Sequence, residues 1–269
     1  MLNLLYGFAL GRMLLKILTY PRLSIIAGKF LDSKASRFLI PLFIKKNNIS
    51  LEEYEDEEYE SFNAFFTRRI KPECRPVDTD PNHFIAPCDG YLSVYPIEDG
   101  LIMPVKQSMY SVADLLKDEE LAKEYDGGTC MVFRLCVHHY HRYCYLDGAF
   151  KDDNVHIDGV LHTVRPVALR KVPVFKENSR EYTILHTDHF GDVIQMEVGA
   201  MFVGRIDNYH QKARVERGAE KGRFLFGGST IIVLTKKDMV RVPSSVFDKT
   251  RRGKEILVKQ GQKIDIRKR

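Results

Sequence analysis

The sequence predicts an α+β fold in which a β-rich body of antiparallel strands follows an N-terminal α-helical extension. From about Phe84 onward, short runs of Val, Ile, Tyr and Phe alternate with Gly, Pro, Asp and Asn, a pattern typical of strands joined by turns. Within this body only the segment Ser111–Tyr125 favours a helix. We expect strands at Cys130–Val137, Tyr182–His186, Val193–Val198 and Ile231–Leu234.

Length and composition allow one large domain or two small ones, with enough apolar residues for a packed core. The chain has 269 residues, of which 44% are hydrophobic. We divide it into a helical segment with an acidic linker, residues 1–60, and a β-rich domain, residues 61–269. The five cysteines are odd in number and follow no Cys-x-x-Cys spacing, which favours a reducing compartment over a disulfide framework.

The N-terminal segment combines apolar residues with an excess of positive charge. Residues 1–50 contain eight Lys and Arg and one acidic residue. The longest uncharged stretch is too short to cross a bilayer, and the charges follow the apolar run, whereas in a secretory signal they precede it. We expect an interfacial helix ending near Pro21 and a second apolar segment, which bind an anionic membrane surface through residues 1–46 and no nucleic acid. A helix pair packed on its own domain or on a second subunit is the alternative.

An acidic run separates this basic segment from the body of the chain. Residues 51–60 carry seven Asp and Glu. That composition is typical of a solvated linker or helix face, and we expect no chemistry from it.

A histidine cluster, His138-His139-Tyr140-His141, lies directly after the predicted strand Cys130–Val137. If that strand continues, His139 and His141 point to the same face of the sheet. Paired zinc ligands are one interpretation, although the sequence identifies no third ligand. A general acid/base at His141 is another, since imidazole titrates near neutral pH, and a polar strand edge with satisfied histidines is a third.

Two further short motifs have both a structural and a catalytic interpretation. Ala86-Pro87-Cys88-Asp89-Gly90 is typical of a turn before a strand, but Asp89 also fits a carboxylate that orients a histidine. Gly227-Gly228-Ser229-Thr230 is typical of a bend between two strand segments. A serine hydroxyl behind a glycine carbonyl is also what a backbone N-to-O acyl shift requires, because glycine has no Cβ to block the attack.

Taken in order along the chain, these motifs resemble the phosphatidylserine decarboxylases, pyruvoyl-dependent membrane enzymes made as self-cleaving proenzymes. The resemblance runs from about Phe62 to Ile232. Seven segments carry it together, whereas any one alone would be weak. They are Phe62–Arg68 with Arg75-Pro76, Ala86–Gly90, Tyr140–Arg142, Leu161–Val164, Val198–Ile206, Lys221-Gly222 and Phe224–Thr230.

The resemblance implies that the chain cleaves itself between Gly228 and Ser229. Ser229 Oγ would attack the Gly228 carbonyl, and elimination would leave a pyruvoyl group at the start of the smaller of two chains, 1–228 and 229–269. This covalent cofactor would form a Schiff base with the amine of phosphatidylserine and accept the electrons left by departing CO₂, which yields phosphatidylethanolamine. The two chains would stay together as a heterodimer, with or without further homodimerisation. The family also implies a peripheral protein on the cytoplasmic face of the cell membrane.

The family activates its serine with an Asp and a His, which Asp89 and His141 match. One well-known branch carries a second histidine three positions after the first, where this chain has Cys144. The base therefore stays open between His141, His139 and Cys144. Tyr140 is a further candidate for base or substrate contacts. Arg68 and Arg69 are candidates for pairing with a phosphate or carboxylate, because a guanidinium presents matched donors.

Two alternatives come from other functional classes. A zinc-dependent hydrolase on a related β-rich scaffold would use His139 and His141 as ligands and would need bound metal. A non-catalytic lipid-binding relative would bind liposomes through residues 1–46 and release no CO₂.

Overall fold

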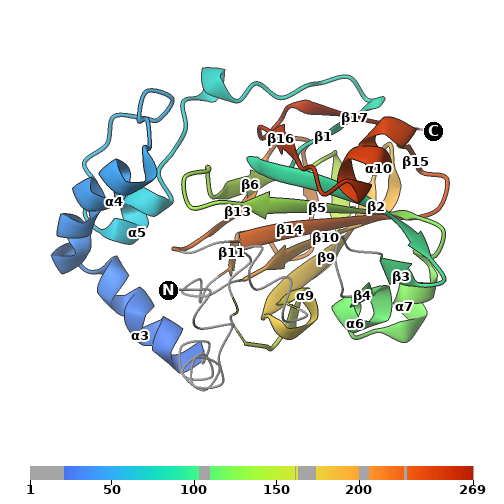
Figure 1. The fold of residues 1–269 in the computed structure, drawn as a ribbon, viewed down its shortest axis with the longest axis horizontal. Coiled ribbons are helices and arrows are strands. Elements are labelled where there is room, and N and C mark those ends of the chain that lie inside the picture. The colour runs from blue at the N-terminus through green and yellow to red at the C-terminus, as the bar shows by residue number, and fades with distance from the viewer. Residues whose placement is uncertain are drawn as a thin grey trace.

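The fold mixes helices with antiparallel sheet, which confirms the predicted α+β class. The computed structural model describes residues 21–102, 110–160, 162, 174–199, 206–226 and 229–268, and Figure 1 shows its first helices set beside a large sheet. Every ladder between the described strands is antiparallel. The interfacial helix predicted before Pro21 lies outside the described residues, as do Gly227 and Gly228 and much of the matched segments Leu161–Val164 and Val198–Ile206.

Four short helices form the first described part of the chain. They are α3 (Pro21–Asp32), η1 (Lys34–Phe38), α4 (Leu39–Asn47) and α5 (Phe62–Phe66). Helix α4 ends where Asn48 adopts the left-handed conformation, with φ of 49°. Ser61 caps α5, because its Oγ accepts a hydrogen bond from the backbone N–H of Ala64 at 3.1 Å. Within the described residues, no helix is long and apolar enough to span a membrane.

An aromatic cluster joins these helices to the end of the β-rich body. The rings of Phe43 in α4 and Phe62 in α5 meet edge to face, with centroids 5.1 Å apart. Phe226 packs on the Phe62 ring at 4.8 Å and on Phe66 at 5.1 Å. Such pairs contribute about 0.5–1.5 kcal/mol beyond the burial of their area. The helical part of the chain therefore contacts the residue directly before Gly227.

One eleven-stranded sheet dominates the body, in the order β12-β7-β9-β10-β14-β5-β2-β3-β4, with β16 on β2 and β8 on β9. The four predicted strands all belong to it: β5 (Thr129–Leu135), β9 (Arg180–Thr187), β10 (Gly191–Val198) and β14 (Ser229–Thr235). The other members are β2 (Gly90–Glu98), β3 (Leu101–Ile102), β4 (Tyr110–Ser111), β7 (Ala149–Lys151), β8 (Val155–Ile157), β12 (Ala213–Val215) and β16 (Ile256–Val258).

Smaller elements cover both faces of this sheet. One face packs against helix α10 (Ser244–Arg251) and two three-stranded sheets, whose strands are β1 (His83–Ile85), β17 (Lys263–Lys268), β15 (Val240–Arg241), β11 (Ile206–Asn208), β13 (Glu220–Phe224) and β6 (Arg142–Cys144). A one-turn 3₁₀ helix, η2 (Pro72–Cys74), precedes β1. The other face packs against α6 (Val112–Leu116), α7 (Glu119–Lys123) and α9 (Val174–Glu177). The predicted helix Ser111–Tyr125 is thus confirmed as the pair α6 and α7.

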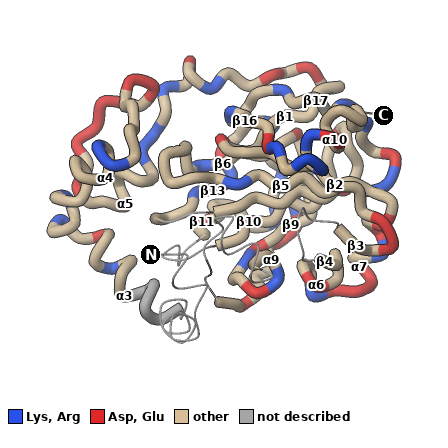
Figure 2. Tube along the Cα trace, viewed as in Figure 1, with Lys and Arg blue, Asp and Glu red and all other residues tan. Residues whose placement is uncertain are grey.

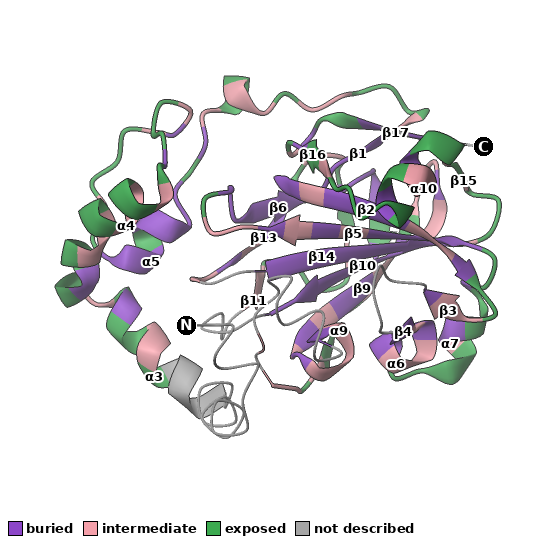
Figure 3. Ribbon diagram, in the orientation of Figure 1, coloured by how far each residue is buried: buried purple, intermediate pink, exposed green. Residues whose placement is uncertain are grey.

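Strand β14 runs through the centre of the core and is buried along its whole length (Figure 3). Its side chains alternate between the two faces, so that Ile231 and Val233 belong to one apolar cluster and Ile232 and Leu234 to the other. Each such side chain contributes roughly 1.5–3 kcal/mol when it leaves water. This double burial fixes the register of β14, and with it the position of its first residue, Ser229.

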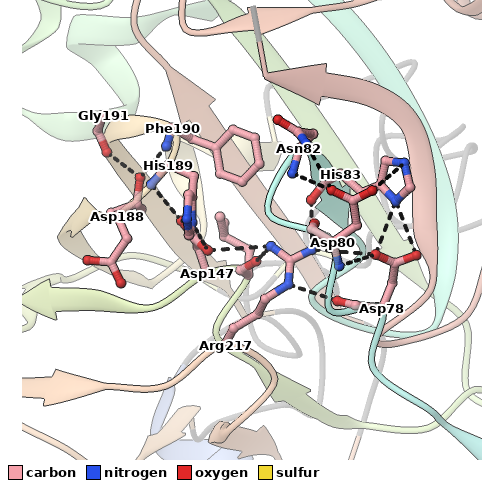
Figure 4. Close-up of polar contacts among 12 residues, drawn as sticks. Asp78, Asp80, Asn82, His83, Asp147, Asp188, His189, Phe190, Gly191 and Arg217 are labelled. Atoms are coloured by element: carbon pink, nitrogen blue, oxygen red, sulfur yellow. Dashed lines mark hydrogen bonds and ion pairs between the residues drawn. The ribbon is translucent and has the colours of Figure 1, made fainter.

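A polar cluster fastens the segment before β1 to the rest of the body (Figure 4). Arg217 donates hydrogen bonds to the backbone carbonyls of Asp78 and His83 at 2.8 and 2.7 Å. It also contacts the carboxylate of Asp147, which is buried and is hydrogen-bonded by His189. A single guanidinium therefore joins three segments that are far apart in the sequence.

Candidate active site

The sheet register places Ser229 beside the end of the strand that leads into the histidine cluster. Ser229, the first residue of β14, pairs with Leu135, the last residue of β5. Arg223, near the end of β13, pairs with Arg142 at the start of β6. The segments 136–141 and 225–228 therefore connect the same two pairs of neighbouring strands. Parts of the sequence that are far apart along the chain meet at this point.

Ser229 carries a buried hydroxyl with an unused hydrogen-bonding capacity. The residue is fully buried, and its Oγ has no hydrogen-bond partner among the described residues. Because side chains alternate along a strand, Ser229 lies on the same face of the sheet as Ile231 and Val233. That face also packs against Phe224 and the strands β6 and β13. A buried orphan hydroxyl is uncommon in folded proteins and suits a reactive group.

The histidine cluster forms a turn, so the prediction that His139 and His141 share one strand face is wrong. Strand β5 ends at Leu135, and a turn follows at residues 137–139. The His139 backbone N–H donates to the Cys136 carbonyl at 2.9 Å, and the Cys136 N–H donates to His139 Nδ1 at 3.0 Å. These local hydrogen bonds replace the strand ladder that the sequence pattern suggested.

His141 is oriented as a neutral base. Its Nδ1–H donates to the His139 carbonyl at 2.8 Å, and since a carbonyl only accepts, the lone pair of the ring is left on Nε2. Nε2 has no partner among the described residues. Burial lowers the pKa of His141 well below its usual value, and the positive charge of Arg68 lowers it further. The backbone of His141 is fixed beside the end of β13, because its carbonyl accepts the Phe224 N–H at 2.9 Å.

His139 has the opposite tautomer. Its Nδ1 accepts the hydrogen bond from Cys136, so the ring proton of neutral His139 lies on Nε2. Burial lowers the pKa of His139 to about 4, and the neighbouring His138 lowers it as well. Burial likewise raises the pKa of the Cys144 thiol to about 12, which keeps this residue protonated near neutral pH. Of the three candidate bases, only His141 presents a free lone pair.

Asp89 lies at the same edge of the sheet and is bound by an arginine. It comes directly before β2, whose Tyr91 pairs with Arg134 of β5. Arg75 donates to both carboxylate oxygens, at 2.8 and 2.6 Å, and the Gln260 N–H donates to Oδ1 at 2.9 Å. No hydrogen bond joins Asp89 to a histidine among the described residues. A Cβ at Gly90 would lie 2.9 Å from the Arg134 carbonyl, which explains the glycine after Asp89.

The arginine partner of Asp89 is a site residue that sequence reasoning missed. Arg75 also donates to Glu53 at 2.9 Å, and Lys259 donates to the other oxygen of the same carboxylate. Glu53 belongs to the acidic run 51–60, which is therefore not wholly solvated. The signal that would have identified Arg75 is its Arg-Pro motif, which lies within the family resemblance.

Two of the candidate substrate contacts lie in an aromatic layer beside this site. Tyr140 is buried, and its ring lies 6.3 Å from that of Tyr54. Burial raises the pKa of Tyr140, so it stays a neutral phenol. Arg68 is buried beside Tyr54 as well, and the ring of Phe66, two residues before it, packs on the His141 ring with centroids 4.1 Å apart and planes tilted by 39°.

The zinc interpretation gains no support from this geometry. In the part of the chain that the structure describes, no three His, Cys, Asp or Glu side chains gather around a common point. Nδ1 of His139 and of His141 each already makes a hydrogen bond to the backbone.

Comparison with known proteins places most of the chain in one family. The sequence model of the family described as "Phosphatidylserine decarboxylase" matches residues 62–266. A protein of Clostridium acetobutylicum named "Phosphatidylserine decarboxylase proenzyme 2" is 45% identical over 265 residues, covering 98% of this chain and 90% of the relative. Proteins named "Phosphatidylserine decarboxylase proenzyme" are 42% identical in Ruminiclostridium cellulolyticum and 39% identical in Clostridium botulinum, with 98% and 99% of this chain and 90% and 92% of the relatives covered.

Proposed function

The chain belongs to the phosphatidylserine decarboxylase family, and we propose that Ser229 is converted into the ketone electrophile of its reaction. It is an enzyme, a decarboxylase that converts phosphatidylserine to phosphatidylethanolamine. We propose that the chain is made as a precursor and cleaves itself between Gly228 and Ser229. The products are the chains 1–228 and 229–269, which remain together as a heterodimer.

The observation that carries this proposal is that two buried, unused groups lie on segments that connect the same two pairs of strands. Ser229 Oγ and His141 Nε2 are both buried and both lack a hydrogen-bond partner among the described residues. The segments 136–141 and 225–228 join the same neighbouring strands. A neutral imidazole lone pair and a buried hydroxyl are the two groups that an internal acyl shift needs.

The cleavage chemistry follows from these groups. His141 Nε2 removes the Ser229 hydroxyl proton as Oγ attacks the Gly228 carbonyl carbon, and the proton passes to the departing Ser229 nitrogen. The peptide becomes an ester with a free amine. Loss of the Ser229 α-proton then expels the Gly228 carboxylate and leaves dehydroalanine, which takes up water and releases ammonia. Asp89, fixed in place by Arg75, supplies a negative charge at the same edge of the sheet.

In the mature enzyme, the tautomers of His139 and His141 define what each ring can do. The pyruvoyl group formed at residue 229 supplies a ketone electrophile that accepts the electron pair released as CO₂ leaves. His139 presents an N–H at Nε2 and is suited to donate a hydrogen bond, whereas the free lone pair of His141 is suited to accept a proton. Both rings are buried, which keeps water away from their ring nitrogens.

The experiment that tests this function compares two neighbouring hydroxyls. Ser229→Ala removes the proposed precursor of the ketone, and we expect no phosphatidylethanolamine from phosphatidylserine vesicles. Thr230→Val is the matched control, because Thr230 Oγ1 is also buried without a partner among the described residues but lies on the opposite face. Decarboxylation by Ser229→Ala at the wild-type rate would overturn the proposal.

We further propose that the enzyme meets its lipid at the cytoplasmic face of the cell membrane through its helical segment. Helices α3 and α4 and the turn between them expose large apolar side chains, namely Ile26, Phe30, Phe38 and Leu42. Exposed cations alternate with them along the chain, namely Lys29, Lys34, Arg37, Lys45 and Lys46 (Figure 2). Apolar residues interleaved with Lys and Arg are typical of a surface that binds anionic lipid.

A pair of leucines with the same exposure tests the membrane surface. Leu42 in α4 is 62% exposed, and Leu257 in β16, which is 61% exposed, is the matched control. We expect Leu42→Asp to weaken co-sedimentation with phosphatidylserine vesicles about tenfold, because it removes an apolar contact and adds a repelled charge. Leu257→Asp should leave vesicle binding unchanged. Equal effects of both substitutions would contradict this surface.

A further inference from the structure

Arg68 is a buried cation without a matching anion. Its side chain is 1% exposed, and its guanidinium carbon lies 4.0 Å from the centre of the Tyr54 ring and 4.8 Å from that of Phe65. Nη1 donates to the Phe65 carbonyl at 3.3 Å. Nε and Nη2 have no hydrogen-bond partner among the described residues. Two donors on the same planar group are therefore buried and unused.

Two acidic residues of this region, Asp89 and Glu53, are bound by other cations. Asp89 is bound by Arg75 through both oxygens, and Glu53 is bound by Arg75 and Lys259. Arg68 makes no ion pair within the described part of the chain. A buried charge without an opposite charge costs several kcal/mol, and the two aromatic rings offset part of that cost without satisfying either N–H. Such a group is expected where a ligand supplies the missing anion.

Arg68 is held at the edge of the reactive site. The carbonyl of Thr67, the preceding residue, accepts a hydrogen bond from Arg142 Nε at 2.7 Å, and this fixes the backbone. Phe66 contacts the His141 ring, with centroids 4.1 Å apart, and packs on Phe226, which comes just before Gly227. Arg68 is also close enough to His141 for its charge to lower the pKa of that imidazole.

We propose that Arg68 binds the phosphodiester of the phospholipid headgroup, with Nε and Nη2 donating to two phosphate oxygens. This inference rests on the proposed function, because it assumes that phosphatidylserine enters the site around Ser229. A guanidinium presents parallel N–H groups that match two oxygens of one phosphate. The aromatic rings of Tyr54 and Phe65 hold the Arg68 guanidinium in one orientation before the lipid binds.

The phosphate fits this receptor better than the carboxylate of the same headgroup does. Decarboxylation removes the negative charge of the carboxylate as the C–C bond breaks, so a cation bound to it would stabilise the ground state more than the transition state. The phosphodiester keeps its charge throughout the reaction. Binding energy from this unreactive group positions the serine moiety without opposing the loss of CO₂.

The test uses two small probes that separate the anionic groups. Glycerophosphoethanolamine carries the phosphodiester without a carboxylate, and L-serine carries the carboxylate without a phosphate. Each is titrated by calorimetry into the purified wild-type protein and into Arg68→Gln, Arg68→Lys and Arg69→Gln. Arg69 is the matched control, because it is the adjacent arginine in the chain and is exposed.

We expect Arg68→Gln to raise the Kd for glycerophosphoethanolamine about ten- to a hundredfold, since a charge-assisted hydrogen bond contributes about 1.5–3 kcal/mol. Arg68→Lys should raise this Kd less, because an ammonium keeps the charge but lacks the two parallel N–H groups. If Arg68→Gln does not fold, the Kd of Arg68→Lys is the test. Binding of L-serine and all binding by Arg69→Gln should stay unchanged. The KM for phosphatidylserine should rise by the same factor, with kcat changed less than about threefold.

Two results would overturn the inference. One is an unchanged Kd for glycerophosphoethanolamine in folded Arg68→Gln or Arg68→Lys, and the other is a selective loss of L-serine binding. Failure of the proposed function is seen separately, as a wild-type protein that remains one chain and releases no CO₂. Variants that still cleave into two chains but keep wild-type probe binding would contradict the phosphate receptor alone.

Discussion

His139 and His141 lie two positions apart at one turn, yet their hydrogen bonds give them different chemistry. His139 accepts a backbone N–H at Nδ1, whereas His141 donates from Nδ1 to a backbone carbonyl. The lone pair is therefore free at Nε2 only in His141. Both rings are buried, which lowers the pKa of each and keeps both neutral at pH 7.

This difference predicts distinct effects of the same substitution. His141→Gln should slow self-cleavage roughly a hundredfold or more, the range expected when a general base is removed. His139→Gln should slow cleavage less than about tenfold and should instead reduce decarboxylation by the cleaved enzyme. Electrophoresis of freshly purified protein over time measures the first effect, and phosphatidylethanolamine release measures the second. Faster cleavage by His141→Gln than by His139→Gln would contradict the assignment.

Some residues of the candidate site can be predicted from the sequence, and others cannot. Ser229, Asp89 and His141 follow from short motifs, because each motif is local in the chain. The partner of Asp89 does not, since Arg75 is 14 residues away and meets it only through the tertiary fold. The buried state of Arg68 is equally invisible in the sequence, where it resembles its exposed neighbour Arg69.

At the scale of elements, the pairing of strands determines which residues of the candidate site lie close together. Strands β5 and β14 carry clear apolar patterns and are predictable one by one. Their adjacency is not predictable from pattern, because a long stretch of chain separates Leu135 from Ser229. A local effect explains the error at the histidine cluster, where the His139 ring accepts a hydrogen bond from the Cys136 backbone N–H and β5 ends at Leu135.

The polar cluster around Arg217 gives a prediction for stability. In the Ser229→Ala background, Arg217→Leu should lower the free energy of unfolding by about 3 kcal/mol, because it leaves the buried Asp147 without its cation. Arg214→Leu is the control, since Arg214 forms a solvent-exposed pair with Asp188, and such pairs contribute little to stability. Urea denaturation measures both. Equal losses for the two variants would contradict the role of the cluster.

Among the described residues, the helical part contacts the β-rich body through an aromatic cluster and through polar contacts of the acidic run. Composition and charge predict these two parts and their order along the chain. The contact between them does not follow from composition, since Phe43 meets Phe226 only after the helices fold back onto the body. The proposed lipid-facing part therefore contacts Phe226, the residue directly before the two glycines of the cleavage motif.

Buried histidines predict how the stability of the whole molecule depends on pH. Burial lowers the pKa of His139 and His141, so the unfolded chain binds protons more readily than the folded one. The free energy of unfolding should therefore fall as the pH drops below about 6.5, by about 1.4 kcal/mol per pH unit for each histidine, and for His139 down to about pH 4. His186 opposes this, because hydrogen bonds to Asp192 and Asp152 raise its pKa, but it is an exposed group.

Urea denaturation of the Ser229→Ala protein at pH 7, 6 and 5 checks this dependence. The His139→Gln variant in the same background should show a shallower decline, because one of the titrating groups is gone. Stability that stays level or rises between pH 7 and pH 5 would contradict the neutral state of the buried imidazoles.

Intact mass spectrometry of the freshly purified wild-type protein tests the central claim most directly. We expect two chains, 1–228 and 229–269, with the smaller one lighter by one ammonia than a chain that begins with serine. That deficit identifies a ketone at residue 229. A single mass for residues 1–269 in protein that decarboxylates phosphatidylserine, or a small chain with a free amine, would contradict the account.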